Sequence, residues 1–580
     1  AETMVSILLV GEGNFSFSAS LCDSGEDADH ITATCYEAEG SVRQQRLSWR
    51  NVQHLRSKGA EVHFGVDATK LDEYGFITNH LYDRIIFNFP HCGRKAGVKK
   101  NRDLLSNFFH GCTGVLAAKG EIHVALCQGQ GGTPADQSKR EWHNSWQVVA
   151  MAATAGFILT SVVPFEPDNH YGYQSTGYRS QEKSFRVIGA LNHVFTRSLT
   201  MEKLSALQII EKFSSVREPQ CIDDEVDGGF LGKTSRHPIG VIYKELVKCF
   251  RQKLQVNALE DTFPVICRHD SCSSRPSYSA AHSRLYFVTP GTEEEGSESS
   301  GGFHRTPLCS VEAANNRTAA LHHLRPSLTC FISAISHKSI CRPVPLIVVS
   351  GLVFRKCLIS PQSMPVYHEM LMLLDCRERL RLVTDTMNTA VASITSTETV
   401  NSEKIRLGEK GDYIVTRSPA DPDRVIGTIK EAPPGDLAKM FIVSLNLDLL
   451  AMCLLGIEDW RLLWTEDDRF RTQFHHRDLK PYQPFSLYPP YYIHDVSFWV
   501  EEDAVFDDVE FHTVALQMSK GNIVDIQLLD QYKNAETGRT GLCYRLKYQS
   551  CDRALSYRAA LAMQMQLRDE LPRSLHVVLR

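Results

Sequence analysis

The 580-residue sequence lacks long apolar runs, paired cysteines and an excess of basic charge. It contains no run of eighteen apolar residues, so we expect no membrane-spanning helix. Its seventeen cysteines are scattered and form no Cys-x-x-Cys pair, which disfavours a zinc site or a disulfide framework and indicates a reducing compartment. The formal net charge is −5, so any contact with nucleic acid must come from a local basic patch.

The length and the first residues set two further expectations. A chain of this length is expected to fold as three or four domains. Residues 1–4 carry an acid and lead at once into an apolar run, so neither a secretory nor an arginine-rich mitochondrial leader is expected. We therefore expect a cytoplasmic or a nuclear, including nucleolar, location and disfavour a mitochondrial one.

Short apolar runs alternate with helical stretches over residues 1–199, including a helix expected over 141–155. This rhythm predicts a Rossmann-like, doubly wound α/β sheet. The first run, Ile7–Val10, is apolar at every position and leads into Gly11 and Gly13, where the backbone can turn tightly. Open α/β sheets bind nucleotides at such turns.

The next three apolar runs also end in polar residues. The second ends at Glu37, the third leads into Asp67, and the fourth runs into residues 88–91 (Asn-Phe-Pro-His). In nucleotide-binding sheets an acid after the second strand binds the ribose hydroxyls. This order of strand ends is typical of S-adenosylmethionine-dependent methyltransferases more than of dehydrogenases, which need no Asn-x-Pro-aromatic motif.

Three of these turns resemble one family closely. Residues 11–18 (GEGNFSFS), 65–69 (GVDAT) and 87–93 (FNFPHCG) are similar to motifs of the large-subunit rRNA uridine-N3 methyltransferases. The similarity continues through 101–105 and Trp146 to about residue 195, and thus covers the first third of the chain. The resemblance implies S-adenosyl-L-methionine as cofactor and N3 of an RNA uridine as the methyl acceptor.

The strand ends and the resemblance together predict the site residues. The expected cofactor-binding residues are Gly11, Glu12, Gly13, Asn14, Phe15, Glu37, Asp67 and Ala68, and the expected catalytic residues are Asn88, Pro90 and His91. In related turns an Asn grips the target nitrogen and an aromatic ring stacks on the base; here His91 takes the ring's place and could also accept the N3 proton. The alternatives are helix N-caps or solvated loop positions for Glu37 and Asp67, and a structural histidine at 91.

Basic side chains follow the predicted catalytic turn. Five cations within nine residues suit RNA phosphates, although a solvated loop is the alternative. They are Arg94, Lys95, Lys99, Lys100 and Arg102. A loop rich in tyrosine and glycine comes later, at 171–179, and its rings are expected to pack within the loop rather than to stack on bases.

The middle of the chain begins with a connector at 200–236 and a helix expected from His237 to Leu254. Residues 289–302 are acidic and polar, with no aliphatic side chain to bury, which predicts a disordered linker. Residues 351–356 and 364–369 resemble motif 2 and the following segment of class II phenylalanyl-tRNA synthetases. Residues 444–459 resemble their motif 3 region.

The chemistry of this synthetase-like part has changed. Arg355 stands at the motif 2 arginine, but Ser444 and Asn446 replace motif 3 glycines and Leu449 replaces the arginine that holds phosphates. An aliphatic side chain cannot stabilise phosphoryl charge. We therefore predict that 237–485 is a degenerate class II α+β core without aminoacylation activity.

The last stretch reads as a small α+β domain. Strands expected at 495–500, 523–532, 542–548 and 576–579, with helices at 507–518 and 556–571, give the ferredoxin-like order βαββαβ. Residues 486–580 resemble the ferredoxin-fold anticodon-binding domain that ends phenylalanyl-tRNA synthetases. An RNA-facing surface would carry Lys533, Arg539, Arg545 and Lys547, and a solvated strand face is the alternative.

The three parts together resemble the ferredoxin-fold anticodon-binding domain-containing proteins of animals. The resemblance implies an S-adenosylmethionine-dependent RNA base methyltransferase, acting on uridine N3 of rRNA or tRNA, whose tail binds structured RNA. The alternative is a catalytically inactive RNA-binding adaptor derived from a synthetase. The enzyme is favoured because the methyltransferase-like part keeps its polar positions, whereas the synthetase-like part has lost a charge that its chemistry needs.

Overall fold

The computed structural model of the chain divides into two compact units. The first comprises residues 1–201, 484–492 and 549–561, and the second comprises 202–483, 493–548 and 562–580. The described residues are 5–25, 30–93, 97–137, 140–177, 185, 187–214, 229–268, 284–288, 322–339, 345–395, 405–408, 412–416, 424–432, 440–474 and 479–580. The predicted linker at 289–302 and residues 215–228 of the predicted connector lie outside them.

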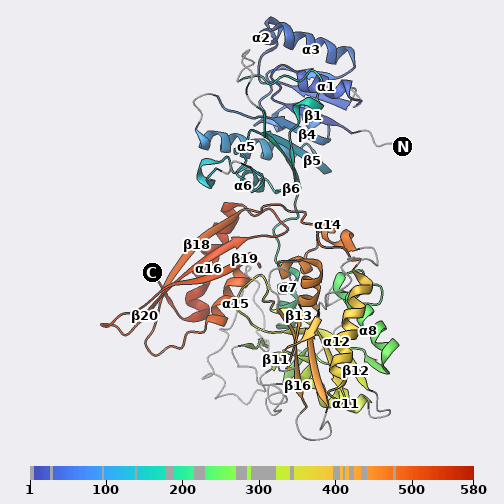
Figure 1. Cartoon of the computed structure of the whole chain (residues 1–580). Helices are drawn as coiled ribbons and strands as arrows, with labels where there is room; N and C mark the ends of the chain where they lie inside the picture. The colour runs from blue at the N-terminus through green and yellow to red at the C-terminus, as the bar shows by residue number, and fades with distance from the viewer. Residues whose placement is uncertain are drawn as a thin grey trace, which may run out of the picture. The chain divides into compact units, whose positions relative to one another are not determined.

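A seven-stranded sheet forms the centre of the first unit (Figure 1). Its order is β3-β2-β1-β4-β5-β7-β6, and β7 alone runs antiparallel to its neighbours. The strands are β1 (Ile7–Val10), β2 (Ile31–Thr34), β3 (Glu61–His63), β4 (Tyr82–Asn88), β5 (Leu116–Leu126), β6 (Phe157–Pro164) and β7 (Leu191–Arg197). The predicted doubly wound sheet is confirmed, and β7 separates it from all-parallel dinucleotide-binding sheets.

Both faces of this sheet carry buried cores. Along β1, Leu8 and Val10 join the core that contains α5, while Ile7 and Leu9 join the core that contains α1 and α3, as strand alternation requires. The helices are α1 (Ser16–Asp23), α2 (Glu39–Gln44), α3 (Arg46–Ser57), α4 (Gly75–Thr78), α5 (Val98–Cys112) and α6 (Val148–Ala153), with 3-10 turns η2 (Leu71–Glu73), η3 (Trp142–Asn144) and η4 (Pro167–Asn169). The single helix predicted over 141–155 is wrong, because the chain breaks at Gln147, whose φ is 52°.

A second seven-stranded sheet, in the order β14-β15-β16-β17-β13-β12-β8, organises the synthetase-like part. Every pair is antiparallel except β12 with β8. Its strands are β8 (Val256–Leu259), β12 (Leu346–Phe354), β13 (Val366–Leu374), β14 (Ile405–Leu407), β15 (Tyr413–Thr416), β16 (Arg424–Glu431) and β17 (Phe441–Asn446). Strands β12 and β13 are buried at all nine positions each, so they form the centre of an α+β core.

Helices and short elements surround this sheet. The helix predicted from His237 is confirmed as α8, where the His237 side chain accepts from the Ile239 N–H at the N-cap. The helices are α7 (Ser205–Ser214), α8 (Pro238–Lys253), α11 (Ile332–Ser339), α12 (Arg379–Ile394), α13 (Leu447–Leu455) and α14 (Asp468–Arg471), with 3-10 turns η7 (Leu328–Phe331), η8 (Trp460–Trp464) and η9 (Thr472–Phe474). A small sheet contains β9 (Ile266–Arg268), β10 (Phe287–Val288) and β11 (His322–Leu324).

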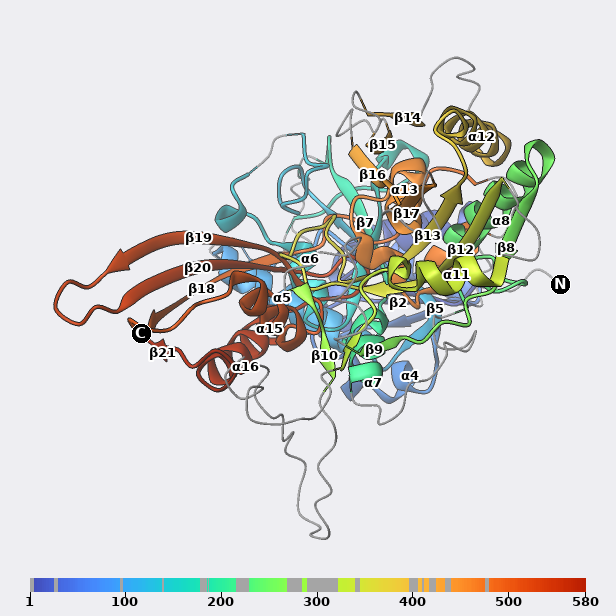
Figure 2. The same cartoon turned by 90° about the horizontal axis from the view of Figure 1, so that it is seen from below.

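The C-terminal part has the predicted βαββαβ order. Its elements are β18 (Tyr491–Val500), α15 (Asp508–Met518), β19 (Ile523–Lys533), β20 (Thr540–Gln549), α16 (Tyr557–Leu575) and β21 (Val578–Leu579). The strands are arranged β19-β20-β18-β21, so the first and third strands of this part lie in the middle of its sheet. Figure 2 shows β19 and β20 as a long hairpin. Its turn comprises residues 534–539 and thus begins two residues before the predicted 536–541.

The structure also bears on the expectations for membrane-spanning helices and for cysteines. Among the described residues, no helix is long and apolar enough to cross a membrane. The thirteen cysteines that the structure describes are all free thiols.

Burial of His512 predicts a pH-dependent stability. Its Nδ1 accepts from the Ile359 N–H at 2.8 Å, and burial lowers the pKa of His512 to about 4. Between pH 6.5 and 4 the unfolded chain binds a proton there that the folded chain does not, so the free energy of unfolding falls as the pH falls. We expect His512→Asn, which keeps a hydrogen-bond acceptor, to have a weaker pH dependence. Its free energy of unfolding should change less steeply with pH than that of the wild type, by about 1.4 kcal/mol per pH unit.

Denaturant titrations at pH 7, 6 and 5 measure this contribution as a difference between the two proteins. The wild-type and variant curves should converge as the solution becomes acidic. Parallel curves would contradict the prediction.

Candidate active site and nucleic-acid-binding surfaces

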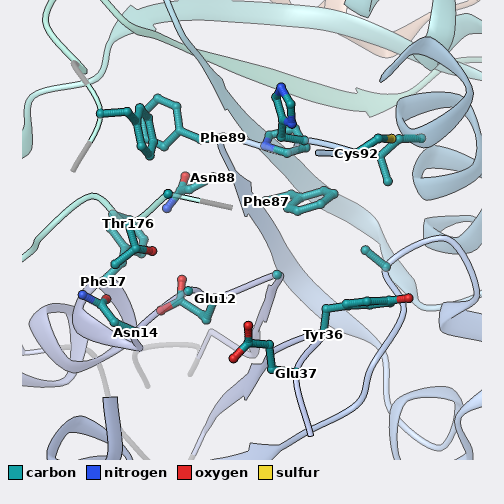
Figure 3. Close-up of a pocket in the computed structure, with 18 of the residues that line it drawn as sticks. Glu12, Asn14, Phe17, Tyr36, Glu37, Phe87, Asn88, Phe89, Cys92 and Thr176 are labelled. Atoms are coloured by element: carbon teal, nitrogen blue, oxygen red, sulfur yellow. The ribbon is translucent and has the colours of Figure 1, made fainter. Parts of the chain in front are cut away.

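A cavity of about 760 Å³ lies at the carboxyl ends of β1, β2, β3 and β4 (Figure 3). Most of the predicted cofactor-binding and catalytic residues line it. The sequence could suggest that these residues lie together only through the order of the strands. Its walls are Gly11, Glu12, Gly13, Asn14, Phe17, Tyr36, Glu37, Val66, Asp67, Ala68, Thr69, Phe87, Asn88, Phe89, Pro90, His91, Cys92, Leu104, Cys127, Gln130, Trp146, Tyr173, Gln174, Thr176, Gly177 and Phe185. The structure therefore brings four strand ends into one site.

Two glycines keep the turn after β1 close to its neighbours. Gly11 has a φ of +68°, and a Cβ there would lie 2.5 Å from Cε2 of Phe87. A Cβ on Gly13 would lie 1.9 Å from Oγ1 of Thr176. Any side chain at either position would therefore displace the wall of the cavity, which explains why the turn contains glycine.

The turn's polar residues are held by local hydrogen bonds. The carboxylate of Glu12 accepts from the N–H and the hydroxyl of Ser18, at 3.2 and 2.7 Å, in the first turn of α1. Burial raises the pKa of Glu12 above its usual value, although the bonds from Ser18 oppose that effect. Asn14 is buried, and its Oδ1 accepts from the Ser16 N–H at 3.0 Å. Both side chains thus shape the turn as well as line the cavity.

Phe15 is the one predicted cofactor-binding residue whose side chain lies elsewhere. It is fully buried, adopts a φ of 59° before α1, and meets the ring of Phe64 edge-on at 5.9 Å. Only its backbone remains for the predicted role.

Two acids face the cavity from neighbouring strand ends. Glu37 follows β2 and accepts from Nε2 of Gln45 at 3.0 Å. The Oδ1 atom of Asp67 accepts from the N–H and hydroxyl of Thr69, at 2.9 and 2.7 Å. Ala68, beside Asp67, lines the same wall. Asp67 therefore closes a loop turn and caps no helix, and its carboxylate borders the cavity.

The turn after β4 contains a buried hydrogen-bond donor that has no partner among the described residues. Among the described residues, Nδ2 of Asn88 is buried and has no hydrogen-bond partner. The next residue, Phe89, has a φ of 51°, which is strained for an aromatic residue, and its N–H donates to the Ala125 carbonyl at 2.9 Å. Pro90 is buried behind the turn. A buried amide donor normally has a partner, so Asn88 is positioned to donate to a ligand.

His91, the predicted proton acceptor, is held by the backbone of its own turn. Its Nδ1 accepts from the Gly93 N–H at 2.7 Å, and burial lowers the pKa of His91. The neutral ring with Nδ1 as acceptor carries its proton on Nε2. Nδ1 of His91 is therefore engaged by the turn. No contact tests whether the ring takes the N3 proton, so that role stays a prediction.

The basic cluster after this turn divides into two kinds of residue. Arg94 and Lys95 lie outside the described residues, and Lys99 and Lys100 are exposed at the start of α5. Arg102 instead donates to three backbone carbonyls of the η3 turn: Ser145 at 2.7 Å, His143 at 2.9 Å and Trp142 at 3.3 Å. The prediction of an RNA contact is therefore corrected for Arg102, because its guanidinium positions the loop that precedes Trp146.

We expect Arg102→Lys to lower the free energy of unfolding by about 1–3 kcal/mol, because lysine keeps the charge but cannot reach three carbonyls. The salt dependence of RNA binding should not change, whereas Lys99→Gln should make it shallower. Denaturant titration and RNA titrations at several salt concentrations measure the two effects. A shallower salt dependence in Arg102→Lys with unchanged stability would restore the RNA contact.

The predicted RNA face of the C-terminal domain is partly neutralised by acids. Arg545 donates to both carboxylate oxygens of Asp495 at 2.9 Å, and this contact holds the pKa of Asp495 below its usual value. Arg539 pairs with Glu501 at 2.9 Å. Lys547 lies on the same face of β20 as Arg545, and Lys533 is exposed at the end of β19. RNA phosphates would have to compete with carboxylates for both arginines, so the contact stays a prediction.

In the synthetase-like core, side chains at the resembling motifs bind one another. Ser444 donates to the buried carboxylate of Glu369, which also accepts from the Ser327 hydroxyl at 2.9 Å. Asn446 caps α13 by accepting from the Leu449 N–H at 2.9 Å. The Arg355 Nε donates to the Pro326 carbonyl at 2.7 Å. The residues that replaced the catalytic groups have therefore become structural.

Two family models match this chain. One, described as rRNA (uridine-N3-)-methyltransferase BTM5-like, matches residues 8–177, and the other, Ferredoxin-fold anticodon binding domain, matches 486–580. The Homo sapiens ferredoxin-fold anticodon-binding domain-containing protein 1 is 38% identical over 619 residues, which is 99% of this chain and 99% of that protein. The chain belongs to this family.

Two further relatives are similar to this chain. The Mus musculus homolog of ferredoxin-fold anticodon-binding domain-containing protein 1 is 39% identical over 622 residues, covering 98% of this chain and 99% of its own. The chloroplastic/mitochondrial phenylalanine–tRNA ligase of Arabidopsis thaliana is 36% identical over 138 residues, covering 24% of this chain and 32% of its own. The predicted methyltransferase-like head, synthetase homology and ferredoxin-fold tail are confirmed.

Several residues that line the cavity of this family member were not predicted. Tyr36 is 59% exposed at the end of β2, and Trp146 and Gln130 are joined by the Trp146 N–H bond to the Gln130 carbonyl at 2.7 Å. In Figure 3, Thr176 and Asn88 lie on one side of the cavity and Tyr36 lies on the other. Thr176 comes from a loop far along the chain from Gly13, so local sequence could not place it.

Tyr173, for which packing was expected, meets the rings of Phe17 and Phe165 edge-on at 5.7 Å each. It also borders the cavity. These rings lie outside the 171–179 loop, so Tyr173 packs against α1 and Phe165 rather than within its loop, and Tyr171 is 91% exposed.

Proposed function

We propose that this protein is an S-adenosyl-L-methionine-dependent RNA methyltransferase that modifies N3 of uridine. The observation that carries the proposal is the buried, unpartnered Nδ2 of Asn88 in a turn that matches the methyltransferase family model. That turn lies in a cavity formed by four strand ends. A structural turn would leave no such donor in need of an acceptor.

The residues of the cavity fit the cofactor. The turn at Gly11 and Gly13 leaves no space for a Cβ, which is how a backbone comes close to a ligand. Glu37 and Asp67 border the cavity from the next two strand ends, where carboxylates accept from ribose hydroxyls or an adenine amino group. When bound, S-adenosylmethionine supplies a methyl group already activated on a sulfonium centre.

The donor set favours uracil. N3 of uracil lies between two carbonyl oxygens, and Nδ2 of Asn88 is the donor that we assign to the carbonyl at C4. Cytosine has an amino group in place of one carbonyl. Its N–H donor would face the N–H donor of the site, and no hydrogen bond would form. A donor at this carbonyl also stabilises the charge that spreads onto its oxygen as N3 loses its proton, so proton loss becomes easier.

The target base must leave its helix or loop, because N3 lies on the Watson–Crick edge. Lys99 and Lys100 are placed to bind phosphates beside the turn, and the ferredoxin-fold domain would bind the structured part of the same RNA, either rRNA or tRNA. The synthetase-like core serves as a scaffold. We place this activity in the cytoplasm or the nucleus.

Methyl transfer to RNA tests the proposal. The full chain would be incubated with labelled S-adenosylmethionine and transcripts of tRNA and large-subunit rRNA, and the digested nucleosides would be analysed for 3-methyluridine. Labelled 3-methyluridine in the wild type and none with Asn88→Ala supports the proposal. Cofactor binding without transfer to any transcript would favour the inactive RNA-binding adaptor.

A further inference from the structure

A second cavity, of about 210 Å³, lies on the α1 side of the N-terminal sheet. It shares Phe17 and Asn88 with the larger cavity, so the two meet at the catalytic turn. Its remaining walls are Leu21, Arg84, Ile86, His123, Pro164, Phe165, Glu166, Asn169, His170 and Asn192. None of these ten belongs to the predicted site.

Asn192 contributes a buried acceptor to this cavity. His123 bonds through Nε2 to Glu121 at 2.9 Å, and burial lowers the pKa of His123, so the neutral ring carries its proton on Nε2. Its Nδ1 is then an acceptor and fixes the Asn192 amide with Nδ2 toward it, at 3.2 Å. The Oδ1 atom of Asn192 is left buried without a partner among the described residues. A ligand donor would satisfy it.

Aromatic rings form the opposite wall. The rings of His170 and Phe165 are stacked with an interplanar angle of 25° and centroids 5.9 Å apart, and His170 lies 4.4 Å from the ring of Phe17. Burial lowers the pKa of His170, so this wall is uncharged at neutral pH. A wall of flat, neutral rings suits stacking of a nucleobase.

We infer that this second cavity binds an unstacked base of the RNA next to the target nucleotide. The inference rests on the proposed function, which places the target base at Asn88. A base carries an N–H donor for Oδ1 of Asn192 and a flat face that can stack on the aromatic wall. Arg84 lines the same cavity and has a positive charge that can bind the connecting phosphate. Glu166 borders the same cavity and disfavours a ligand that is only an anion.

Two adjoining base cavities would select the RNA segment. Asn88 lies between them, so two neighbouring bases must leave their stack together before methylation. A regular duplex cannot present two adjacent bases in this way, whereas a loop or bulge can. The second cavity therefore determines which uridines are substrates.

Short oligouridylates test the inference with the full chain. Calorimetric titrations in the presence of S-adenosylhomocysteine would compare uridine monophosphate with di- and triuridylate. We expect one added nucleotide to tighten binding by about tenfold or more in the wild type, a step typical of one stacked base. Asn192→Leu and His170→Leu should each reduce this step to less than about threefold, and Asn79→Leu, an exposed asparagine of the same domain, should preserve it.

Each outcome has one meaning. The inference is overturned if the gain in affinity per added nucleotide is equal in the wild type and both cavity variants. It is also overturned if the wild type shows no such gain. The cavity then holds water only. Neither Asn192 nor His170 lines the larger cavity, so retained binding of S-adenosylhomocysteine shows that a variant is folded. If one variant no longer binds S-adenosylhomocysteine, the result of the other variant tests the inference. Failure of the wild type to bind S-adenosylhomocysteine refutes the proposed function itself.

Discussion

Asn88→Ala is expected to lower kcat/KM for RNA methylation by about 10²–10³-fold while leaving the Kd of S-adenosylmethionine within about threefold. The Nδ2 donor of Asn88 is buried without a protein partner, so its hydrogen bond can form only with a ligand. A donor at a pyrimidine carbonyl acts most strongly when N3 loses its proton and charge gathers on that oxygen. The loss should therefore appear in kcat rather than in cofactor binding.

The matched control is Asn79→Ala, which makes the same change at an exposed position of the same domain. It should leave both constants unchanged. An Asn88→Ala enzyme that retained wild-type kcat would place the target base elsewhere in the cavity. Loss of cofactor binding together with kcat would make Asn88 a cofactor ligand instead.

The largest effect on stability is expected for Arg325→Met, at about 3–5 kcal/mol. Arg325 is fully buried in the synthetase-like core, where it pairs with Asp261 and donates to the carbonyls of Leu352 at 2.7 Å and Phe263 at 3.1 Å. Methionine matches its length but leaves the Asp261 carboxylate without its cation. The free energy of unfolding from denaturant titrations measures the loss.

A double variant separates the ion pair from simple packing. Arg325→Met with Asp261→Leu removes both charges, so it should be less destabilised than Arg325→Met alone. Equal or greater destabilisation of the double variant would show that the Arg325 hydrogen bonds to Leu352 and Phe263 matter more than its pairing with Asp261.

This ion pair also explains what the synthetase-like core has become. A Cβ on Gly351 of β12 would lie 1.9 Å from a carboxylate oxygen of Asp261 and 2.7 Å from Nη2 of Arg325, so the pair packs directly on the strand. Arginine, aspartate and glutamate side chains there bind other groups of the core rather than a substrate. This buried ion pair thus stabilises the packing of the core.

The strand ends of the active site were predictable because each has a local signature. A four-residue apolar run before Gly11, and polar residues where later runs end, identify Glu37, Asp67 and Asn88 without knowledge of distant contacts. The C-terminal βαββαβ order followed from similar local patterns. These features depend on residues near one another in the sequence.

Other features depend on partners that local sequence does not specify. Arg102 and Lys99 look alike in a basic cluster, and only the carbonyls of the η3 turn, about forty residues away, make Arg102 structural. The proton position on His91 depends on the Gly93 N–H, which a motif cannot show. The Asn192 acceptor becomes visible only when β5 and β7 pair.

Calorimetric titration of S-adenosylmethionine into the full chain tests the central claim most directly. The account predicts saturable binding in the micromolar range, weakened at least tenfold by Asp67→Ala because Asp67 borders the cavity, and unchanged by Asp72→Ala at an exposed position nearby. Absence of binding at millimolar cofactor, in a chain shown to be folded by its unfolding transition, would contradict it and leave the RNA-binding adaptor as the function.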